Sequence, residues 1–298
     1  PAGPISPARN RILLLGVLVG LAVPGVVFLM ILFLDTRVHS RKDLKGAVSI
    51  PFLGEIPQDK KTAKTNVPAD QEDSMLSESF RILRTNMTFM AKKDKPMQVI
   101  TFTSFNEGAG KTFISRNLAM SLMLTRKRVV LVDLDIRKGT LSRHFRKHPV
   151  GVTNYLADDS IALDDIIHTD EKSGGLDIIS SGTVAPNPAE LLMDGRLDTL
   201  IDELRKRYDY IIVDNVPVGI VADATISNRI SDLTIFVARA GKLDRRQLPD
   251  MEELYREGKL RNMSLILNGV DPKRRGYGYG YGYGYGYGYG YGKHNRKK

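Results

Sequence analysis

The chain has 298 residues, 42% of them hydrophobic, enough to bury the core of one domain of about 200 residues with shorter appendages. It has no cysteine, which excludes disulfides and cysteine-ligated zinc and fits a reducing compartment. The net charge of +10 does not indicate nucleic acid, because residues 273–298 hold seven basic and no acidic side chains, whereas residues 1–272 carry 37 basic against 34 acidic ones.

The first predicted element is a membrane-spanning helix. Residues 12–34 are 23 consecutive uncharged, largely aliphatic residues, which would form about 35 Å of helix against a hydrocarbon core of ~30 Å. A buried core helix or a signal-peptide segment is the alternative. The following flank carries Arg37, Arg41, Lys42 and Lys45, so the positive-inside rule predicts that residues 1–11 are extracytoplasmic and the later residues cytoplasmic. Because the sequence begins at Pro1 without methionine, we expect a preceding segment.

Residues 35–72 are predicted to form a juxtamembrane connector with one short strand within 48–57 and an exposed loop after it. The main domain is expected over 73–272. There, apolar runs alternate with helical segments such as 112–125, 197–207 and 247–258, and the runs are Gln98–Thr103, Val129–Asp133, Leu176–Ile179, Tyr210–Asp214, Leu233–Ala238 and Ser264–Asn268. This alternation predicts an α/β fold, a doubly wound parallel sheet with helices on both faces. Ligands of such sheets bind at the carboxyl ends of the strands.

The final segment, residues 273–298, is a glycine-tyrosine repeat. Eight of the twelve tyrosines of the chain lie there: Tyr277, Tyr279, Tyr281, Tyr283, Tyr285, Tyr287, Tyr289 and Tyr291. Glycine at every second position makes ordering costly in conformational entropy. We therefore predict a disordered tail.

A phosphate-binding loop is predicted directly after the run at 98–103. Residues 104–112 read SFNEGAGKT and lead into a helical segment. In such loops the backbone N–H groups surround the phosphates, the lysine reaches the β and γ oxygens, and the hydroxyl binds Mg²⁺. Phe105 replaces the first glycine of the usual motif, but the strand–loop–helix context is intact. We expect these residues to bind ATP, with an incidental glycine-rich turn as the alternative: Gly108, Ala109, Gly110, Lys111 and Thr112.

Carboxylates stand at two more predicted strand ends. The run VLVDLD reaches Asp133 and Asp135, and the run IIVDNVP contains Asp214. The second run has the form of a Walker B motif, whose aspartate holds Mg²⁺ directly or through water. A single aspartate here could simply cap a helix, but three strand ends that suit Mg-ATP favour a nucleotide site.

The set GAGKT, VLVDLDIR and IIVDNVP resembles the Walker A, A′ and B motifs of the bacterial tyrosine kinases that accompany regulators of polysaccharide chain length. The resemblance covers nearly the whole chain. The prolines before the apolar span are similar to the stretch before the second membrane helix of those proteins, and residues 78–84, ESFRILR, match their E-x-x-R-x-x-R oligomerisation motif. The resemblance implies a P-loop fold at the bacterial inner membrane, with kinase domain and tail in the cytoplasm.

The resemblance also implies roles for individual residues. The catalytic set would be Lys111, Asp133, Asp135 and Asp214. Asp133 would act as base or orienter for the attacking phenol, whose free pKa is near 10. The metal ligands would be Thr112, Asp135 and Asp214. Asn268 would contact adenine, with a turn-forming asparagine as the plain alternative.

Three charged residues would mediate assembly: Glu78, Arg81 and Arg84. Their i, i+3, i+6 spacing places them roughly on one side of a helix, where a solvated charged face is the alternative. By resemblance they insert between neighbours in a ring, so that each tail reaches the next subunit's active site.

Two residues depart from related sequences. Glu107 stands where family members often have proline, and an acid there would weaken ATP binding unless its side chain points away. Asn106 stands where related partition and division-site ATPases carry a signature lysine, which favours the kinase branch.

We therefore predict an ATP-dependent protein-tyrosine autokinase that phosphorylates its tail in trans and regulates capsular or exopolysaccharide polymerisation and export. The expected cofactor is Mg²⁺. The expected partners are further copies of the chain, the polysaccharide machinery, a tyrosine phosphatase and the membrane, but not nucleic acid. A membrane-tethered P-loop ATPase without tyrosine transfer is one alternative. A binding protein whose tail self-associates or binds RNA is another, but it leaves the phosphate loop unexplained.

Overall fold

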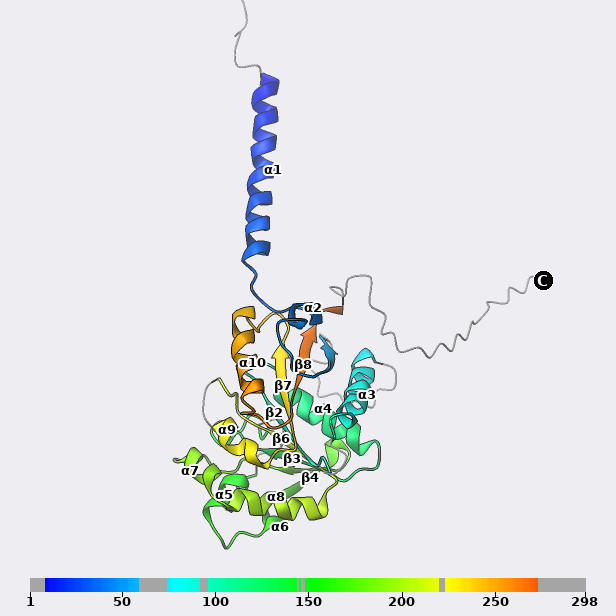
Figure 1. Cartoon of the computed structure of the whole chain (residues 1–298), viewed down its shortest axis with the longest axis vertical. Helices are drawn as coiled ribbons and strands as arrows, with labels where there is room; N and C mark the ends of the chain where they lie inside the picture. The colour runs from blue at the N-terminus through cyan, green and yellow to red at the C-terminus, as the bar shows by residue number, and fades with distance from the viewer. Residues whose placement is uncertain are drawn as a thin grey trace, which may run out of the picture.

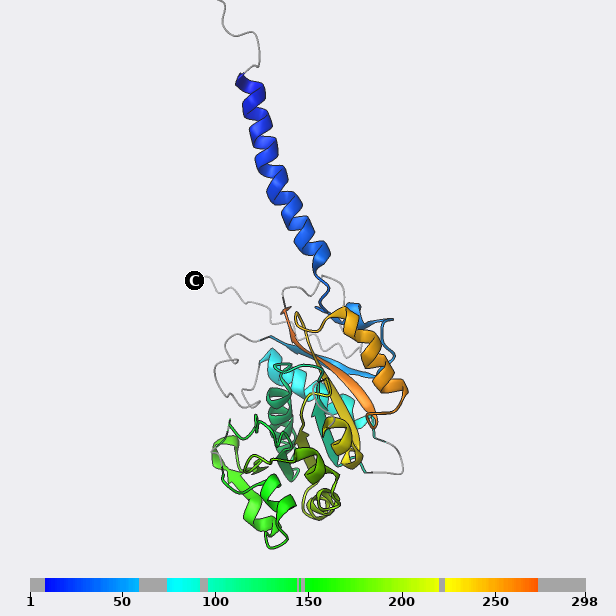
Figure 2. The same ribbon diagram turned by 90° about the vertical axis from the view of Figure 1, so that its left-hand side faces the viewer.

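The computed structural model describes residues 9–58, 74–91, 96–143, 145, 148–219 and 223–272. Helix α1 (Arg9–Leu34) extends away from an α/β domain that contains the other described elements (Figures 1 and 2). The loop expected at 60–73 and the glycine-tyrosine tail with its eight candidate phosphoacceptors lie outside the described residues.

Helix α1 has the length and composition expected of a membrane span. It is continuous through Pro24, and its segment Arg11–Met30 has a mean hydropathy of 2.8 with none of it buried. Within the described ranges, it is the one helix that is long and apolar enough to cross a membrane. At about 1.5 Å per residue it measures about 39 Å, which exceeds a hydrocarbon core of ~30 Å.

The domain is built on an eight-stranded sheet in the order β1-β8-β7-β2-β6-β3-β5-β4. The strands are β1 (Phe52–Pro57), β2 (Val99–Thr103), β3 (Val129–Asp133), β4 (Ile167–Asp170), β5 (Leu176–Ile179), β6 (Tyr210–Asp214), β7 (Leu233–Arg239) and β8 (Met263–Val270). All six strands predicted in the main domain are present, and the strand predicted within 48–57 is β1.

The edge strand β4 departs from the predicted parallel pattern. It pairs with β5 in antiparallel orientation, whereas the remaining neighbours pair in parallel. Its sequence, IHTD, is too short and polar to stand out as a buried run. The chain reverses between β4 and β5 through the 3₁₀-helix η1 (Glu171–Ser173), Gly174 and Gly175, and both glycines have positive φ.

Helices cover both faces of the sheet. They are α2 (Arg41–Leu44), α3 (Met75–Thr88), α4 (Lys111–Met123), α5 (Val152–Ala157), α6 (Leu163–Ile166), α7 (Pro188–Met193), α8 (Arg196–Arg207), α9 (Asp223–Ser227) and α10 (Leu248–Arg256). Successive side chains of a strand point to opposite faces. Ile212 of β6 accordingly packs in the cluster that contains α3 and α4, while Ile211 and Val213 pack with α8.

The segment after α1 belongs to the domain core. Strand β1 pairs in parallel with β8, with Phe52 opposite Leu265. Val38 and Leu44 are buried in a cluster that also contains Met251 of α10. The predicted connector therefore contributes an edge strand and apolar side chains to the domain.

Candidate active site

The predicted phosphate loop lies between β2 and α4, at the carboxyl end of the sheet. Gly108 and Gly110 have φ of 70° and 96°, a conformation that glycine adopts without strain. A β-carbon at Gly110 would lie only 2.1 Å from Nδ2 of Asn268. Gly110 is also the N-cap of α4, so the backbone N–H groups of the first turn are available to an anion.

Asn268 supports this loop from strand β8. It is only 2% exposed, and its Nδ2 donates a hydrogen bond of 2.8 Å to the carbonyl oxygen of Ala109. Asn268 is absent from the lining of the adjacent cavity. The predicted contact with adenine therefore stays a prediction. The contact that Asn268 makes here, with the carbonyl oxygen of Ala109, supports the shape of the loop.

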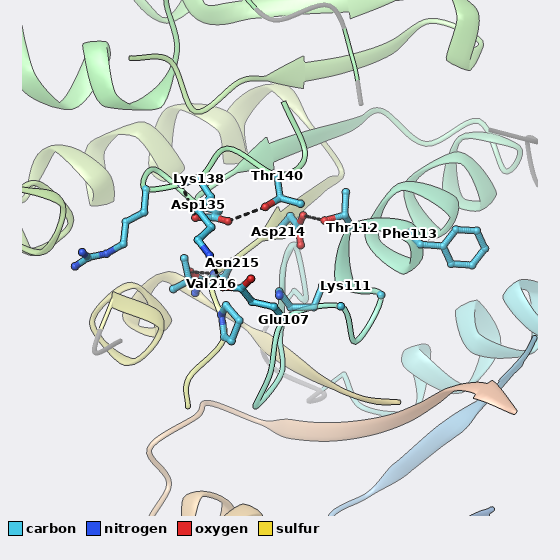
Figure 3. A pocket seen from close by; sticks show the side chains of 14 residues that line it. Glu107, Lys111, Thr112, Phe113, Asp135, Lys138, Thr140, Asp214, Asn215 and Val216 are labelled. Carbon is cyan, nitrogen blue, oxygen red and sulfur yellow. Dashed lines mark hydrogen bonds and ion pairs between the residues drawn. The ribbon is translucent and has the colours of Figure 1, made fainter. Parts of the chain in front are cut away.

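A cavity of about 310 Å³ opens beside the loop (Figure 3). Its wall comes from the phosphate loop, from the loop after β3 and from the end of β6. Its lining residues are Glu107, Gly108, Gly110, Lys111, Thr112, Phe113, Asp135, Arg137, Lys138, Thr140, Asp214, Asn215, Val216 and Pro217. The three predicted metal-binding residues, Thr112, Asp135 and Asp214, all reach this cavity (Figure 3).

Asp214 is the most deeply placed carboxylate of the lining. It is 2% exposed, and Oγ1 of Thr112 donates a hydrogen bond of 2.5 Å to its Oδ2. Among the described residues, its Oδ1 is buried and has no hydrogen-bond partner. Burial raises the pKa of Asp214 to about 6, although Lys111 opposes this shift. A buried carboxylate oxygen without a donor, beside a hydroxyl, suits a divalent cation.

Lys111 lies at the start of α4, where it faces the carboxylates. Burial lowers the pKa of its ammonium group, and Asp214 and Asp135 act in the opposite direction. Its Nζ lies 3.5 Å from Oγ of Ser104. A desolvated ammonium group with so few hydrogen-bond partners is poised for a phosphate oxygen.

Asp133 lies behind the cavity wall. It is fully buried, and its Oδ2 accepts hydrogen bonds from the backbone N–H and the hydroxyl of Ser142, at 2.8 and 2.6 Å. Its Oδ1 accepts from the N–H of Asp135 at 3.1 Å. Burial and the nearby Asp214 raise the pKa of Asp133 to about 7. The role of base or orienter stays a prediction, because here the carboxylate fixes the loop after β3.

Asp135 is the member of this pair that faces the cavity (Figure 3). Its Oδ1 accepts from the backbone N–H of Lys138 and its Oδ2 from Oγ1 of Thr140, both at 3.0 Å. The carboxylate is thereby held in place across the cavity from Asp214.

Ser142 and Ser181 are supporting residues that the sequence motifs did not indicate. Besides binding Asp133, Oγ of Ser142 accepts a hydrogen bond from the N–H of Ser181 at 2.9 Å, and the two hydroxyls lie 3.2 Å apart. The loop after β5 is thus tied to the Walker A′ segment. Ser142 lies nine residues after Asp133, and no spacing rule pointed to it.

Glu107 stands at the mouth of the cavity and forms an ion pair with Lys138. Both side chains are more than half exposed, and the hydrogen bond from Lys138 lowers the pKa of Glu107. The acid that was expected to oppose ATP binding is therefore offset by a neighbouring cation.

Two cations at the end of β7 were also missed. Nη1 of Arg239 lies 3.5 Å from the position of a β-carbon on Gly110, and Nζ of Lys242 lies 3.0 Å from that on Gly108. Both side chains thus flank the phosphate loop. A cation directly after a buried strand, at the ligand-binding end of the sheet, was the available signal.

The predicted assembly residues on α3 divide into two kinds. Glu78 and Arg81 are 60% and 51% exposed and lie 3.4 Å apart. Arg84 instead turns toward α4, where its Nη1 donates a hydrogen bond of 2.6 Å to the carbonyl oxygen of Ser121. Two of the three side chains therefore face solvent, and the third anchors α3 to α4.

The chain resembles known tyrosine kinases in sequence. Residues 97–240 match the family described as an AAA domain. The chain is 35% identical to tyrosine-protein kinase YwqD of Bacillus subtilis over 197 residues, which are 66% of this chain and 82% of that protein. It is 32% identical to a putative tyrosine-protein kinase in the cps region of Klebsiella pneumoniae over 91% of this chain, but it spans only 39% of that protein's length.

Solved structures of tyrosine kinase domains are also similar to this chain. The kinase domain of Escherichia coli tyrosine kinase ETK superposes with a TM-score of 0.72 at 30% identity, covering 83% of this chain and all of that one. The BceF tyrosine kinase domain gives 0.68 at 33% identity, covering 78% of this chain and 99% of that one. Together with the three strand-end motifs around one cavity, these likenesses show that the chain belongs to the family of bacterial tyrosine-protein kinases.

Proposed function

We propose that this chain is an ATP-dependent autokinase that transfers phosphate to the tyrosines of its own tail. The observation that supports this most directly is the cavity at the strand ends, where the phosphate loop faces two carboxylates. The tail supplies eight tyrosines within 17 residues, 276–292. Family membership makes tyrosine the expected acceptor.

The residues of the cavity divide the work of phosphoryl transfer. The N–H groups of the loop and of the first turn of α4 hold the phosphates, and Lys111 offsets their charge. Thr112, Asp135 and Asp214 would hold Mg²⁺, for which the unpartnered Oδ1 of Asp214 is the open ligand position. When bound, the metal ion supplies charge neutralisation on the β and γ phosphate oxygens.

The direct test is mass spectrometry of the tail after incubation with Mg-ATP. We expect several phosphotyrosines in the wild type and none in Lys111→Met, because the substitution removes the phosphate-facing cation while keeping the length of the side chain. Release of inorganic phosphate without phosphotyrosine would instead establish the tethered ATPase. Comparable phosphotyrosine in a folded Lys111→Met chain would refute the site.

Transfer in trans between copies is the second part of the proposal. One chain carries Lys111→Met and an intact tail, and the other carries an intact site and phenylalanine at all eight tail tyrosines. After mixing with ATP, phosphate on the Lys111→Met tail can come only from the partner copy. If the mixed sample stays unphosphorylated while wild type reacts, transfer occurs within one chain.

Ring assembly is supported by the two exposed charges of α3. Arg81→Ala should shift the chain toward monomer and reduce phosphorylation at low protein concentration. Arg84→Ala is the matched comparison for Arg81→Ala. It removes the hydrogen bond between α3 and the carbonyl oxygen of Ser121, so it should lower the melting temperature. If Arg81→Ala leaves the mass of a wild-type oligomer unchanged in light scattering, Glu78 and Arg81 form only a solvated face.

Membership of the family supports a proposal for the cellular role. We propose that α1 anchors the domain at the bacterial inner membrane, with the domain and tail on the cytoplasmic side. There, tail phosphorylation regulates polymerisation and export of a capsular or extracellular polysaccharide, and a tyrosine phosphatase reverses it. Deletion of the reading frame should alter polymer length, and Lys111→Met should reproduce the deletion if catalysis carries the role.

A further inference from the structure

Residues 244–247, the last part of the β7–α10 loop, lie directly at the end of helix α1. The backbone N–H of Arg245 donates a hydrogen bond of 2.8 Å to the carbonyl oxygen of Thr36, and Oγ1 of Thr36 donates one of 3.0 Å to Oδ2 of Asp244. Arg37 and Asp244 also form an isolated β-bridge. Figures 1 and 2 both show α10 at the end of the domain nearest α1, and α8 at the opposite end.

These contacts fix how far the loop can lie from a membrane. Thr36 is the second residue after Leu34, where α1 ends. Two residues span at most ~7 Å. The Debye length under physiological conditions is about 8 Å. The loop therefore stands close enough to feel the surface potential of a bilayer that contains α1.

The charge of the domain is concentrated at this end. We define the membrane-proximal layer as residues 35–45 and 244–247, which together hold six basic and three acidic side chains. Residues 1–272 hold 37 basic and 34 acidic ones, so outside the layer they hold 31 of each and are neutral. The entire surplus of three positive charges before the tail thus lies beside the end of α1.

The cations of the layer are accessible. The side chain of Arg246 is 81% exposed and that of Arg245 is 49% exposed. Each binds one acid of the layer, Asp43 for Arg245 and Asp244 for Arg246, so their guanidinium groups are held at this end of the domain. Arg41, Lys42 and Lys45 are also exposed.

We propose that the membrane-proximal layer binds anionic phospholipid headgroups of the bilayer that α1 enters. The inference rests on the membrane anchoring put forward in the proposed function. Cations beside an anionic leaflet gain attraction that disappears within a Debye length. Arg245 and Arg246 add two headgroup ligands that are far in sequence from the juxtamembrane basic residues. They fix the orientation of the domain, because the layer can face the bilayer only when the start of α10 does so.

The test compares two pairs of basic residues, one at each end of the domain; within each pair the residues are consecutive in the sequence. The 298-residue chain is inserted into nanodiscs made of equal amounts of phosphatidylcholine and phosphatidylglycerol. It is then released into neutral detergent, and the lipids that it retains are counted by native mass spectrometry. We expect wild type to retain phosphatidylglycerol preferentially. Arg245→Glu with Arg246→Glu should lower the preference for phosphatidylglycerol at least about five-fold. This is the loss expected when roughly one cation is removed from beside an anionic surface. The control, Lys206→Glu with Arg207→Glu on α8, changes charge equally and should retain the preference.

Arg245→Gln with Arg246→Gln, which introduces no acid, should lose the preference in part. Autophosphorylation of each variant shows that the domain is folded and tests the kinase proposal separately. Co-elution with the discs tests anchoring before any lipid is counted, and failure to enter them overturns the anchoring. Two results would overturn the headgroup site. One is an equal loss of the phosphatidylglycerol preference in both glutamate variants, and the other is a wild-type chain that retains the two lipids in the ratio present in the nanodisc. Complete displacement of the lipid by inorganic phosphate at matched concentration would assign the layer to soluble phosphate instead.

Discussion

Two carboxylates at opposite ends of the same sheet have opposite environments. Asp214, at the carboxyl end of β6, has one oxygen that no other described residue contacts by a hydrogen bond, and burial raises its pKa to about 6. Asp232, before β7, binds both terminal nitrogens of Arg205 and accepts from the backbone N–H groups of Gln98 and Val99. Burial works to raise the pKa of Asp232, but these donors lower it overall. One carboxylate is satisfied by the fold, and the other is left for a ligand.

Asp214→Asn should have the largest effect on activity. It removes the charge that the metal and Lys111 require, so autophosphorylation should fall by about 100-fold or more. Without nucleotide and Mg²⁺ the melting temperature at pH 7 should be no lower than that of wild type, because the raised pKa of Asp214 means that its ionised form costs folding free energy even with Lys111 nearby. The rate of tail phosphorylation and thermal unfolding by circular dichroism measure the two effects. If Asp214→Asn were active but less stable than wild type, Asp214 would be a structural carboxylate like Asp232 and not a ligand-binding one.

Asp232→Ala should have the converse effect. It leaves Arg205 and two backbone N–H groups without their acceptor, at a cost of about 2 kcal/mol. For a domain of this size the melting temperature should fall by about 4–8 °C. The rate of phosphorylation below the unfolding transition should stay at the wild-type value. A large loss of activity in the folded variant would show that the two ends of the sheet are coupled.

The stability that Asp232 contributes should depend on pH. Because its pKa is lowered in the folded state, this contribution is fully present above the ordinary value of 3.8 and is lost as pH falls below it. The difference in unfolding free energy between wild type and Asp232→Ala should thus be constant from about pH 7 to pH 5 and shrink below about pH 4. Urea unfolding of both proteins over this range measures it. A difference that shrinks between pH 7 and pH 5 would mean that another group is responsible.

The smallest effect is expected for the exposed pair at the mouth of the cavity. Glu107→Gln removes a negative charge near the phosphates and frees Lys138. The dissociation constant for ATP should fall about two- to five-fold at low ionic strength and return toward wild type at about 0.5 M salt. Lys138→Gln should change the affinity in the opposite direction. Isothermal titration calorimetry at two salt concentrations would detect both, and a salt-independent change would point to altered loop geometry.

The parts of the fold that could be predicted have strong local signals. The strands β2, β3 and β6 are apolar runs that end in motif residues, and the register places Asp133 directly opposite Asp214. Strand β4 could not be predicted in the same way, because a four-residue segment with three polar residues pairs only where β5 offers an edge. The docking of Val38 against α10 likewise depends on contacts between residues more than 200 positions apart.

The site was predictable in residue type but less so in orientation. Four residues of the motifs, Lys111, Thr112, Asp135 and Asp214, line one cavity, while their catalytic and metal-binding roles stay predictions. The motifs could not show that Asp133 turns away from this cavity, since that depends on the hydroxyl of Ser142. Residue spacing within a motif fixes position along the chain, whereas the direction of a carboxylate is set by hydrogen-bond donors from other segments.

The pairing of β1 with β8 has a consequence during synthesis of the protein. Phe52 and Leu265 are 213 positions apart, and ribosomes add about 5–20 residues per second. The apolar strand β1 is therefore synthesised about 10–40 s before its partner, a delay that follows from the same rate. Throughout that interval its backbone N–H and C=O groups form an open edge that other nascent chains could join. A ribosome that stalls before residue 263 would leave this edge unpaired, which makes late translational arrest a specific route to aggregation.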